Sequence, residues 1–168
     1  DGVVTTEVET TPSLLLYNGG NSRSVYLDFI RFIVTVAPVG GTRVQFTQSI
    51  DDGNRYTSGG TQLTINNTST LGSVNDLSDA FIVVGGVTAT AATAKRRIIG
   101  HVQTKFVSIE IVHDTHVFSW GPADAAHSHS VISNSTTPCY TAASLPPCVV
   151  GPNQSLVIVR VTATGTTA

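Results

Sequence analysis

Histidine is the residue type with the most obvious chemical potential in this sequence, and four of the five histidines fall in two short stretches. In VHDTHVFSW, His113 and His116 flank Asp114, and HSH contributes His127 and His129. Residues i and i+2 of a strand share a face, so the second pair could bind a zinc or copper ion or titrate as a pH switch. The first pair would converge only across a turn. No glutamate stands nearby as a general base, so we favour histidines bonded to backbone at turns and rims, and predict no metal site.

Acid–base hydrolysis would need a pair of carboxylates. The candidates are Asp51, Asp52, Asp76, Asp79, Glu110 and Asp114. Most of them fall in stretches that look like turns, where Asp is common because its side chain bonds the neighbouring backbone. The sequence contains neither the Gly-x-Ser-x-Gly motif nor the Ser-x-x-Lys motif that would indicate a catalytic nucleophile. We therefore predict no catalytic residues and a protein that is not an enzyme.

The stretch SIDDGNRY resembles a calcium loop superficially, because Asp51, Asp52 and Asn54 offer oxygen ligands. It lacks the later bidentate glutamate of an EF-hand loop. A turn between two strands explains the same residues with fewer assumptions. We predict no cofactor of any kind.

The two cysteines, Cys139 and Cys148, lie in the proline-bounded stretch PCYTAASLPPC. A disulfide between them would close a short loop. Two free thiols are equally consistent with the sequence, because the outcome depends on the redox compartment. A lone pair of cysteines is too small for a zinc site, and no cationic residue stands close in sequence to activate a thiolate.

Exposed aromatic side chains could form a platform for sugar binding. The candidates are Tyr17, Tyr26, Tyr56, Trp120 and Tyr140. Trp120 ends an alternating run, which is more typical of a core or interface residue than of a sugar platform.

The charge content excludes some partners. Charged residues are 12% of the 168 residues and the formal net charge is −2, whereas an average soluble domain has about 25% charged residues. No basic field exists to hold nucleic acid, and the one basic cluster, residues 95–97, fits a solvated loop or salt bridges to a neighbour. No apolar run reaches the roughly 18 residues of a membrane span. A weakly charged surface favours contact with other proteins.

The elements that must position these residues are strands, because apolar residues recur with period two. Residues 30–36 and 44–47 alternate on either side of Pro-Val-Gly-Gly, which predicts a hairpin. Further strands are predicted at 13–17, 61–65, 81–84, 97–100, 107–111, 116–120 and 155–161.

Glycine doublets separate these runs and are predicted to form turns, because glycine tolerates positive φ. They are Gly19-Gly20, Gly40-Gly41, Gly59-Gly60 and Gly85-Gly86. Two spans are candidates for short helices: residues 74–81, with Asp76 as a possible cap, and residues 88–97.

Short, evenly spaced strands predict an all-β fold, an antiparallel β-sandwich of jelly-roll type with at most one or two short helices. In such a fold a strand near Leu15 pairs with, or lies close to, a last strand near Val157. An immunoglobulin sandwich is disfavoured because both cysteines follow Trp120. We predict an extended N-terminal arm over residues 1–12 and one domain over residues 13–168.

Two stretches resemble recurring marks in small proteins of tailed bacteriophages, of the types DxGNRYxSGGTxLTPxN and PPxVIGPGQSL. The first matches at Asp52, Gly53, Asn54, Arg55, Tyr56, Ser58, Gly59, Gly60, Thr61, Leu63, Thr64 and Asn66. The second matches at Pro146, Pro147, Val149, Val150, Gly151, Pro152, Gln154, Ser155 and Leu156. The chain departs from the family at its last residues, TATGTTA, which lack an aromatic tail.

This resemblance, to jelly-roll head decoration or cement proteins, implies a non-enzymatic virion component on the outer surface of the phage head. The implied partners are the major capsid protein and two further copies in a homotrimer, with neither nucleic acid nor membrane. The alternative is a tail or fibre module that binds host glycans. For the decoration role, the N-terminal arm is expected to add to a neighbour's sheet edge.

Overall fold

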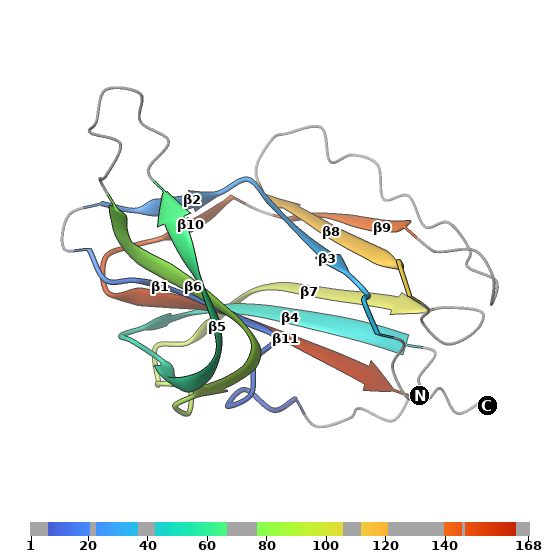
Figure 1. Ribbon diagram of the computed structural model, residues 1–168, viewed down its shortest axis with the longest axis horizontal. Coiled ribbons are helices and arrows are strands. Elements are labelled where there is room, and N and C mark those ends of the chain that lie inside the picture. Colours follow the sequence, from blue (N-terminus) through green and yellow to red (C-terminus); the bar gives the residue numbers. More distant parts are fainter. Residues whose placement is uncertain are drawn as a thin grey trace.

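The computed structural model describes residues 7–20, 23–36, 43–66, 77–105, 112–120, 140–145 and 147–163. All regular structure in these residues is β-strand, which confirms the predicted fold class (Figure 1). The strands are β1 Leu14–Asn18, β2 Val25–Leu27, β3 Phe29–Ile33, β4 Arg43–Asp52, β5 Tyr56–Asn66, β6 Leu77–Ala89, β7 Arg97–Lys105, β8 Thr115–Trp120, β9 Tyr140–Leu145, β10 Cys148–Val150 and β11 Gln154–Ala163.

One sheet has six strands in the order β5-β6-β1-β11-β4-β7. Leu15 pairs with Val157 between β1 and β11, so the predicted neighbours at the two ends of the domain lie side by side. Every described strand pair is antiparallel except β8–β9, which is parallel. The antiparallel prediction therefore holds for all pairs but one.

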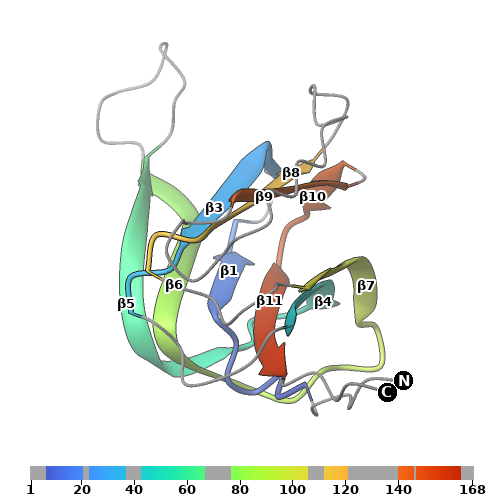
Figure 2. The ribbon, with the colours of Figure 1, turned by 90° about the vertical axis from the view of Figure 1, so that its right-hand side faces the viewer.

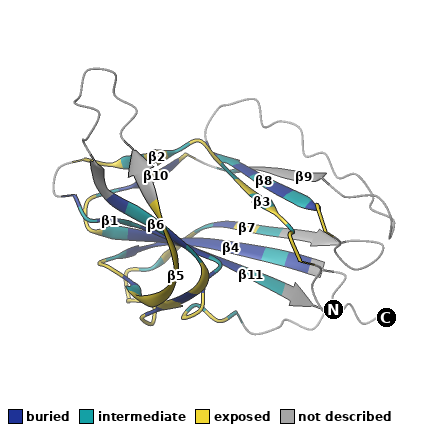
Figure 3. Ribbon diagram, in the orientation of Figure 1, coloured by how far each residue is buried: buried dark blue, intermediate teal, exposed yellow. Residues whose placement is uncertain are grey.

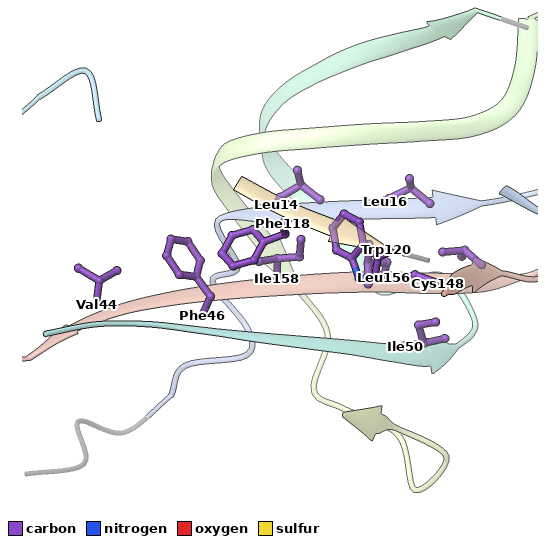
Figure 4. Packing of buried hydrophobic residues seen from close by; sticks show 11 residues of the cluster. Leu14, Leu16, Val44, Phe46, Ile50, Phe118, Trp120, Cys148, Leu156 and Ile158 are labelled. Carbon is purple, nitrogen blue, oxygen red and sulfur yellow. The ribbon is translucent and has the colours of Figure 1, made fainter. Parts of the chain in front are cut away.

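Two small sheets, β3-β8-β9 and β10-β2, form a second layer that we call the small-sheet layer. Figure 2 shows it lying across the large sheet. Buried residues concentrate on the strands that face the space between the layers (Figure 3). The core cluster there, drawn in Figure 4, comprises Leu14, Leu16, Val44, Phe46, Ile50, Phe118, Trp120, Cys148, Val150, Leu156 and Ile158.

The predicted hairpin between residues 30–36 and 44–47 is wrong, although both runs contain strands. β3 bonds to β8, whereas β4 bonds to β11 and β7, so the two runs belong to different layers. Their apolar faces meet across the core, where the rings of Phe32 and Phe46 lie 5.4 Å apart. Period-two alternation predicts a strand with a buried face, and it does not identify the hydrogen-bonded neighbour.

Neither predicted helix forms. Residues 77–81 begin the long strand β6, while residues 74–76 lie outside the described part of the chain. Of residues 88–97, the first two end β6, the last begins β7, and the segment between them forms a turn. Among the described residues, no helical segment has the length and hydropathy of a membrane span. The predicted strand at 107–111 lies outside the described residues, and the other predicted strands are confirmed.

Two of the glycine doublets lie inside strands rather than at turns. Gly59 and Gly60 in β5, and Gly85 and Gly86 in β6, all have φ between +68° and +74°. The register between β5 and β6 shifts at this point, and the paired strands bend away from the rest of the sheet (Figure 2). Positive φ on both strands is accessible to glycine with little strain, so the doublets produce a bulge and a bend.

The outer face of the large sheet carries a second buried cluster, which includes Leu15, Val83 and Val157. The rings of Tyr17 and Tyr56 each lie 5.6 Å from the ring of Phe81 at its margin and help to cover it. The large sheet therefore has apolar clusters on both faces, which stiffens the centre of the domain.

Candidate functional site

The two stretches that carry the phage resemblance meet in space. In the β4–β11 pairing, Asp51 lies opposite Ser155 and Asp52 opposite Gln154. The turn after β4 therefore packs against the turn before β11. We call residues 51–55 and 151–155 together the turn junction.

The side-chain hydroxyl of Ser155 links the two turns. Ser155 Oγ accepts a hydrogen bond from the backbone N–H of Arg55 at 3.1 Å and donates one to the carbonyl of Gly53 at 2.7 Å. The N–H of Gly53 donates in turn to the carbonyl of Asn153 at 2.6 Å. Ser155 is fully buried, so these bonds replace the water that its hydroxyl and the turn backbone would otherwise bind.

Gln154 and Asn153 tie the turn junction to its surroundings. Gln154 Nε2 donates to Asp52 Oδ1 at 3.0 Å, and its Oε1 accepts from the N–H of Gly151 at 2.9 Å. The N–H of Asn153 donates to the carbonyl of Asn18 at the end of β1, at 2.8 Å. Three segments distant in sequence are thus held in one register.

The turn junction contains a buried ion pair. The Arg55 side chain is 1% exposed, and its Nη1 lies 3.5 Å from Oδ2 of the fully buried Asp51. Arg55 also donates to the carbonyl of Thr90 through Nε at 3.2 Å and Nη2 at 2.6 Å. Asp51 accepts from the N–H of Asp52, and from both the N–H and the hydroxyl of Thr93. A buried charge pair persists where such hydrogen bonds compensate for its desolvation.

Residues 7–12 form a strap across this cluster. Glu9 forms an ion pair with Arg96 and lies 3.8 Å from Arg55, while Glu7 lies 3.7 Å from Arg96. The carbonyl of Thr10 accepts from the N–H of Ala89 at 2.8 Å, and Pro12 is buried. Four residues of the predicted arm, Glu7, Glu9, Thr10 and Pro12, therefore pack or bond against the domain, whereas residues 1–6 lie outside the described part.

Two of the three residues of the basic cluster, Lys95 and Arg96, form ion pairs within the chain. Lys95 lies 3.0 Å from Asp52 at the surface, and Arg96 bonds to the strap. The hydrogen bond from Lys95, followed by that from Gln154, lowers the pKa of the Asp52 carboxyl below its ordinary value. Both groups are solvent-exposed, so this pair adds little to stability.

The oxygens of Asp51, one of the candidates for calcium binding and acid–base chemistry, are taken up by contacts within the chain. The Asp51 carboxylate is already surrounded by three donors from the chain and by Arg55. Asp114 is fully buried in the small-sheet layer, and Asp79 lies in β6. Asp76 and Glu110 lie outside the described residues. Asp51 in β4 and Asp114 beside β8 thus lie on different sheets.

The first histidine pair is split by its turn. His113 has a φ of 77° and is exposed. His116 is 2% exposed, and its ring lies 5.0 Å from that of Phe46 in the core. Burial lowers the pKa of His116 to about 4, with Asp114 opposing the shift. Within the described ranges no three potential ligands gather around a common point, and His127 and His129 lie outside them.

The Cys148 thiol is free and buried in the core. Burial raises its pKa to about 11, because the thiolate would lose its hydration. Its proposed partner, Cys139, lies outside the described residues. The sequence left a disulfide and two free thiols open, and the structure has Cys148 as a thiol.

The aromatic candidates do not form one platform. Trp120 is 3% exposed and belongs to the core, as its alternation indicated. Tyr17 and Tyr56 pack against Phe81. Tyr26 is 75% exposed on β2, and Tyr140 lies in β9.

Sequence reasoning missed the strap. Glu7 and Glu9 stand two positions apart, so they share a side of an extended segment. Residues 95–97 supply the opposite charge. This charge complementarity is the one feature of the sequence that could have predicted the contact. Nothing in the local sequence shows that the two segments lie together in the fold.

No protein-family model, curated protein or solved structure matches this chain.

Proposed function

We propose that the protein is a non-enzymatic structural component of a virion, a decoration or cement protein on the outside of a phage head. It binds the major capsid protein and stabilises the shell by its own stiffness. The observation that carries this proposal is the turn junction. Both stretches that resemble the phage family are used there to hold turns together, and their polar groups bond to each other.

Two further features support a mechanical role. Both faces of the large sheet carry buried apolar clusters, which gives the domain a low compressibility. The paired charges of Arg55, Asp51 and Glu9 tie the end of the core to residues before β1. A rigid body of this kind transmits force between neighbours without changing shape.

The proposed assembly is a homotrimer bound to the head. A closed symmetric ring lets each copy present the same surface to the shell. A weakly charged surface is consistent with contacts to protein rather than to nucleic acid.

The test is the copy number and position of the chain in intact particles. Quantitative mass spectrometry of purified particles should give a ratio to the major capsid protein near that of a full decoration lattice, and electron cryo-microscopy should place the chain on the head. Recombinant protein added to undecorated heads should raise their melting temperature. Absence from the particle would overturn the proposal.

Two exposed aromatic residues favour glycan binding as a second candidate function. Tyr26 and Phe29 are exposed side chains close together in sequence on the small-sheet layer, and exposed aromatics bind sugars in glycan-recognition modules. A tail or fibre module would occur in far fewer copies. It would also lose binding on a glycan array when Tyr26 is replaced by Ala, whereas a head protein would show no glycan signal.

A further inference from the structure

Exposed apolar side chains concentrate on one part of the molecule. Nine large apolar side chains of the described residues are exposed, and six of them lie on the small-sheet layer or at its end. They are Tyr26, Phe29, Ile33, Val36, Val112 and Val149. Exposed apolar side chains gathered on one layer of a domain are typical of an interaction site.

The alternation of β3 separates its two faces. Ile30 and Phe32 pack against the core cluster, so Phe29, Arg31 and Ile33 point away from it. Phe29 is 66% exposed and Ile33 46%. Tyr26 and Val149 pair across β2 and β10 on the same outer side. The strand is interrupted at Asp28, which leaves both Asp28 and Phe29 exposed.

Two charges stand within this apolar row, and neither has an ion-pair partner among the described residues. Asp28 and Arg31 lie three positions apart on either side of the stretch Phe29-Ile30. The order along the row is therefore Tyr26, Asp28, Phe29, Arg31, Ile33. If a second copy of the row runs in the opposite direction, apolar residues lie opposite apolar residues and the basic residue lies opposite the acidic one.

We infer that this face binds a second copy of the chain, through a two-fold contact between the β2–β3 segments of two molecules. With the axis beside Phe29, each Asp28 meets Arg31 of the other copy and each Tyr26 meets Ile33 of the other copy. The two Phe29 rings lie next to the axis. A two-fold contact is self-complementary by definition, and this row meets that requirement in both charge and hydrophobicity.

The inference does not depend on the proposed virion role. A two-fold contact through this face can coexist with a three-fold contact of a trimer through another face. In that case the two-fold contact would link neighbouring trimers. Aromatic residues and Arg are the types that dominate protein interfaces, and the row contains both.

The test is charge reversal followed by mixing. Sedimentation velocity of the full chain over a wide concentration range should show pairwise association, as a monomer–dimer equilibrium or, if the trimer also forms in solution, as a trimer–hexamer equilibrium. Asp28→Arg alone and Arg31→Asp alone each place like charges opposite one another, and each should raise the dimer Kd at least about tenfold. An equimolar mixture of the two variants should dimerise, because both contacts in the mixed dimer again join opposite charges.

Two matched apolar-to-polar variants distinguish a specific contact through this face from nonspecific hydrophobic association. Phe29→Ser should weaken the dimer, whereas Ile98→Ser, a change at a 59% exposed residue of β7, should not. Far-UV circular dichroism and melting curves check that each variant is folded. A wild-type chain that stays monomeric up to about 1 mM, the weak end of measurable association, would overturn the inference. So would a mixture that fails to associate, or equal effects of the two Ser substitutions.

Discussion

His116 shows how one residue links burial to the response of the whole protein to pH. Its imidazole is held neutral in the core beside Phe46, and burial lowers its pKa from 6.5 to about 4. The unfolded chain would bind a proton at this position throughout that interval, while the folded chain would not. The histidine therefore contributes stability that is fully present above pH 6.5 and is lost as the pH falls toward 4.

We expect His116→Gln to flatten the pH dependence of folding in this window. The wild-type free energy of unfolding should fall by up to about 1.4 kcal/mol per pH unit on account of this one group. The variant should lack that component of the slope. Urea unfolding at pH 7.0, 5.5 and 4.5 measures the slope, with exposed His113→Gln as the control. Parallel curves for wild type and His116→Gln would refute the assignment.

At the scale of elements, the bend in the β5–β6 pair depends on Gly60. Its φ is +73°, and a Cβ there would lie 2.7 Å from Cγ1 of Val83 and 3.0 Å from the carbonyl oxygen of Val84. Gly86 lies in the same bend with a φ of +71°, but a Cβ there would meet nothing within 4 Å. An alanine would therefore meet an unfavourable positive φ at both positions, whereas its methyl group would clash with neighbouring atoms only at position 60.

Gly60→Ala should therefore be more destabilising than Gly86→Ala. Positive φ alone costs a non-glycine residue about 1–2 kcal/mol, and crowding against Val83 adds about 1–3 kcal/mol more. Because a change of 1 kcal/mol moves the Tm of a domain of this size by about 2–4 °C, calorimetry resolves the difference. Equal Tm values for the two variants would mean that β5 moves to accommodate the methyl group.

At the scale of the whole molecule, the strap changes how an N-terminal arm should be tested. Removal of residues 1–12 takes away both carboxylates that meet Arg96 and one of the two near Arg55. Loss of a partner from a buried charge is costly. We expect this deletion to lower the Tm by several degrees, whereas removal of residues 1–6 alone leaves every described contact in place.

The shorter deletion is therefore the one to use for capsid attachment. If residues 1–6 bind a neighbour's sheet edge, their removal should reduce occupancy on heads with little change in Tm. Glu9→Gln serves as the converse control, because it weakens the strap but keeps the full length. Unchanged occupancy after removal of residues 1–6 would remove the arm from the attachment model.

Local pattern alone determined the all-β class and most of the strands, because alternation of apolar residues is a property of a few neighbouring positions. The expectation that the segments near Leu15 and Val157 lie together came from the jelly-roll class and not from the local pattern. The local pattern misassigned the Gly59-Gly60 and Gly85-Gly86 doublets, since glycine permits positive φ equally in a turn and in a bulge.

Only the tertiary structure decided which strands pair and which merely face each other. Residues 30–36 and 44–47 face each other across the core instead of pairing, because their apolar sides gain more contact by packing between layers. The meeting of Asp51 with Thr93, and of Gly53 with Ser155, likewise joins residues far apart in sequence. Such contacts follow from the packing of the two layers as a whole, so no short stretch of sequence contains them.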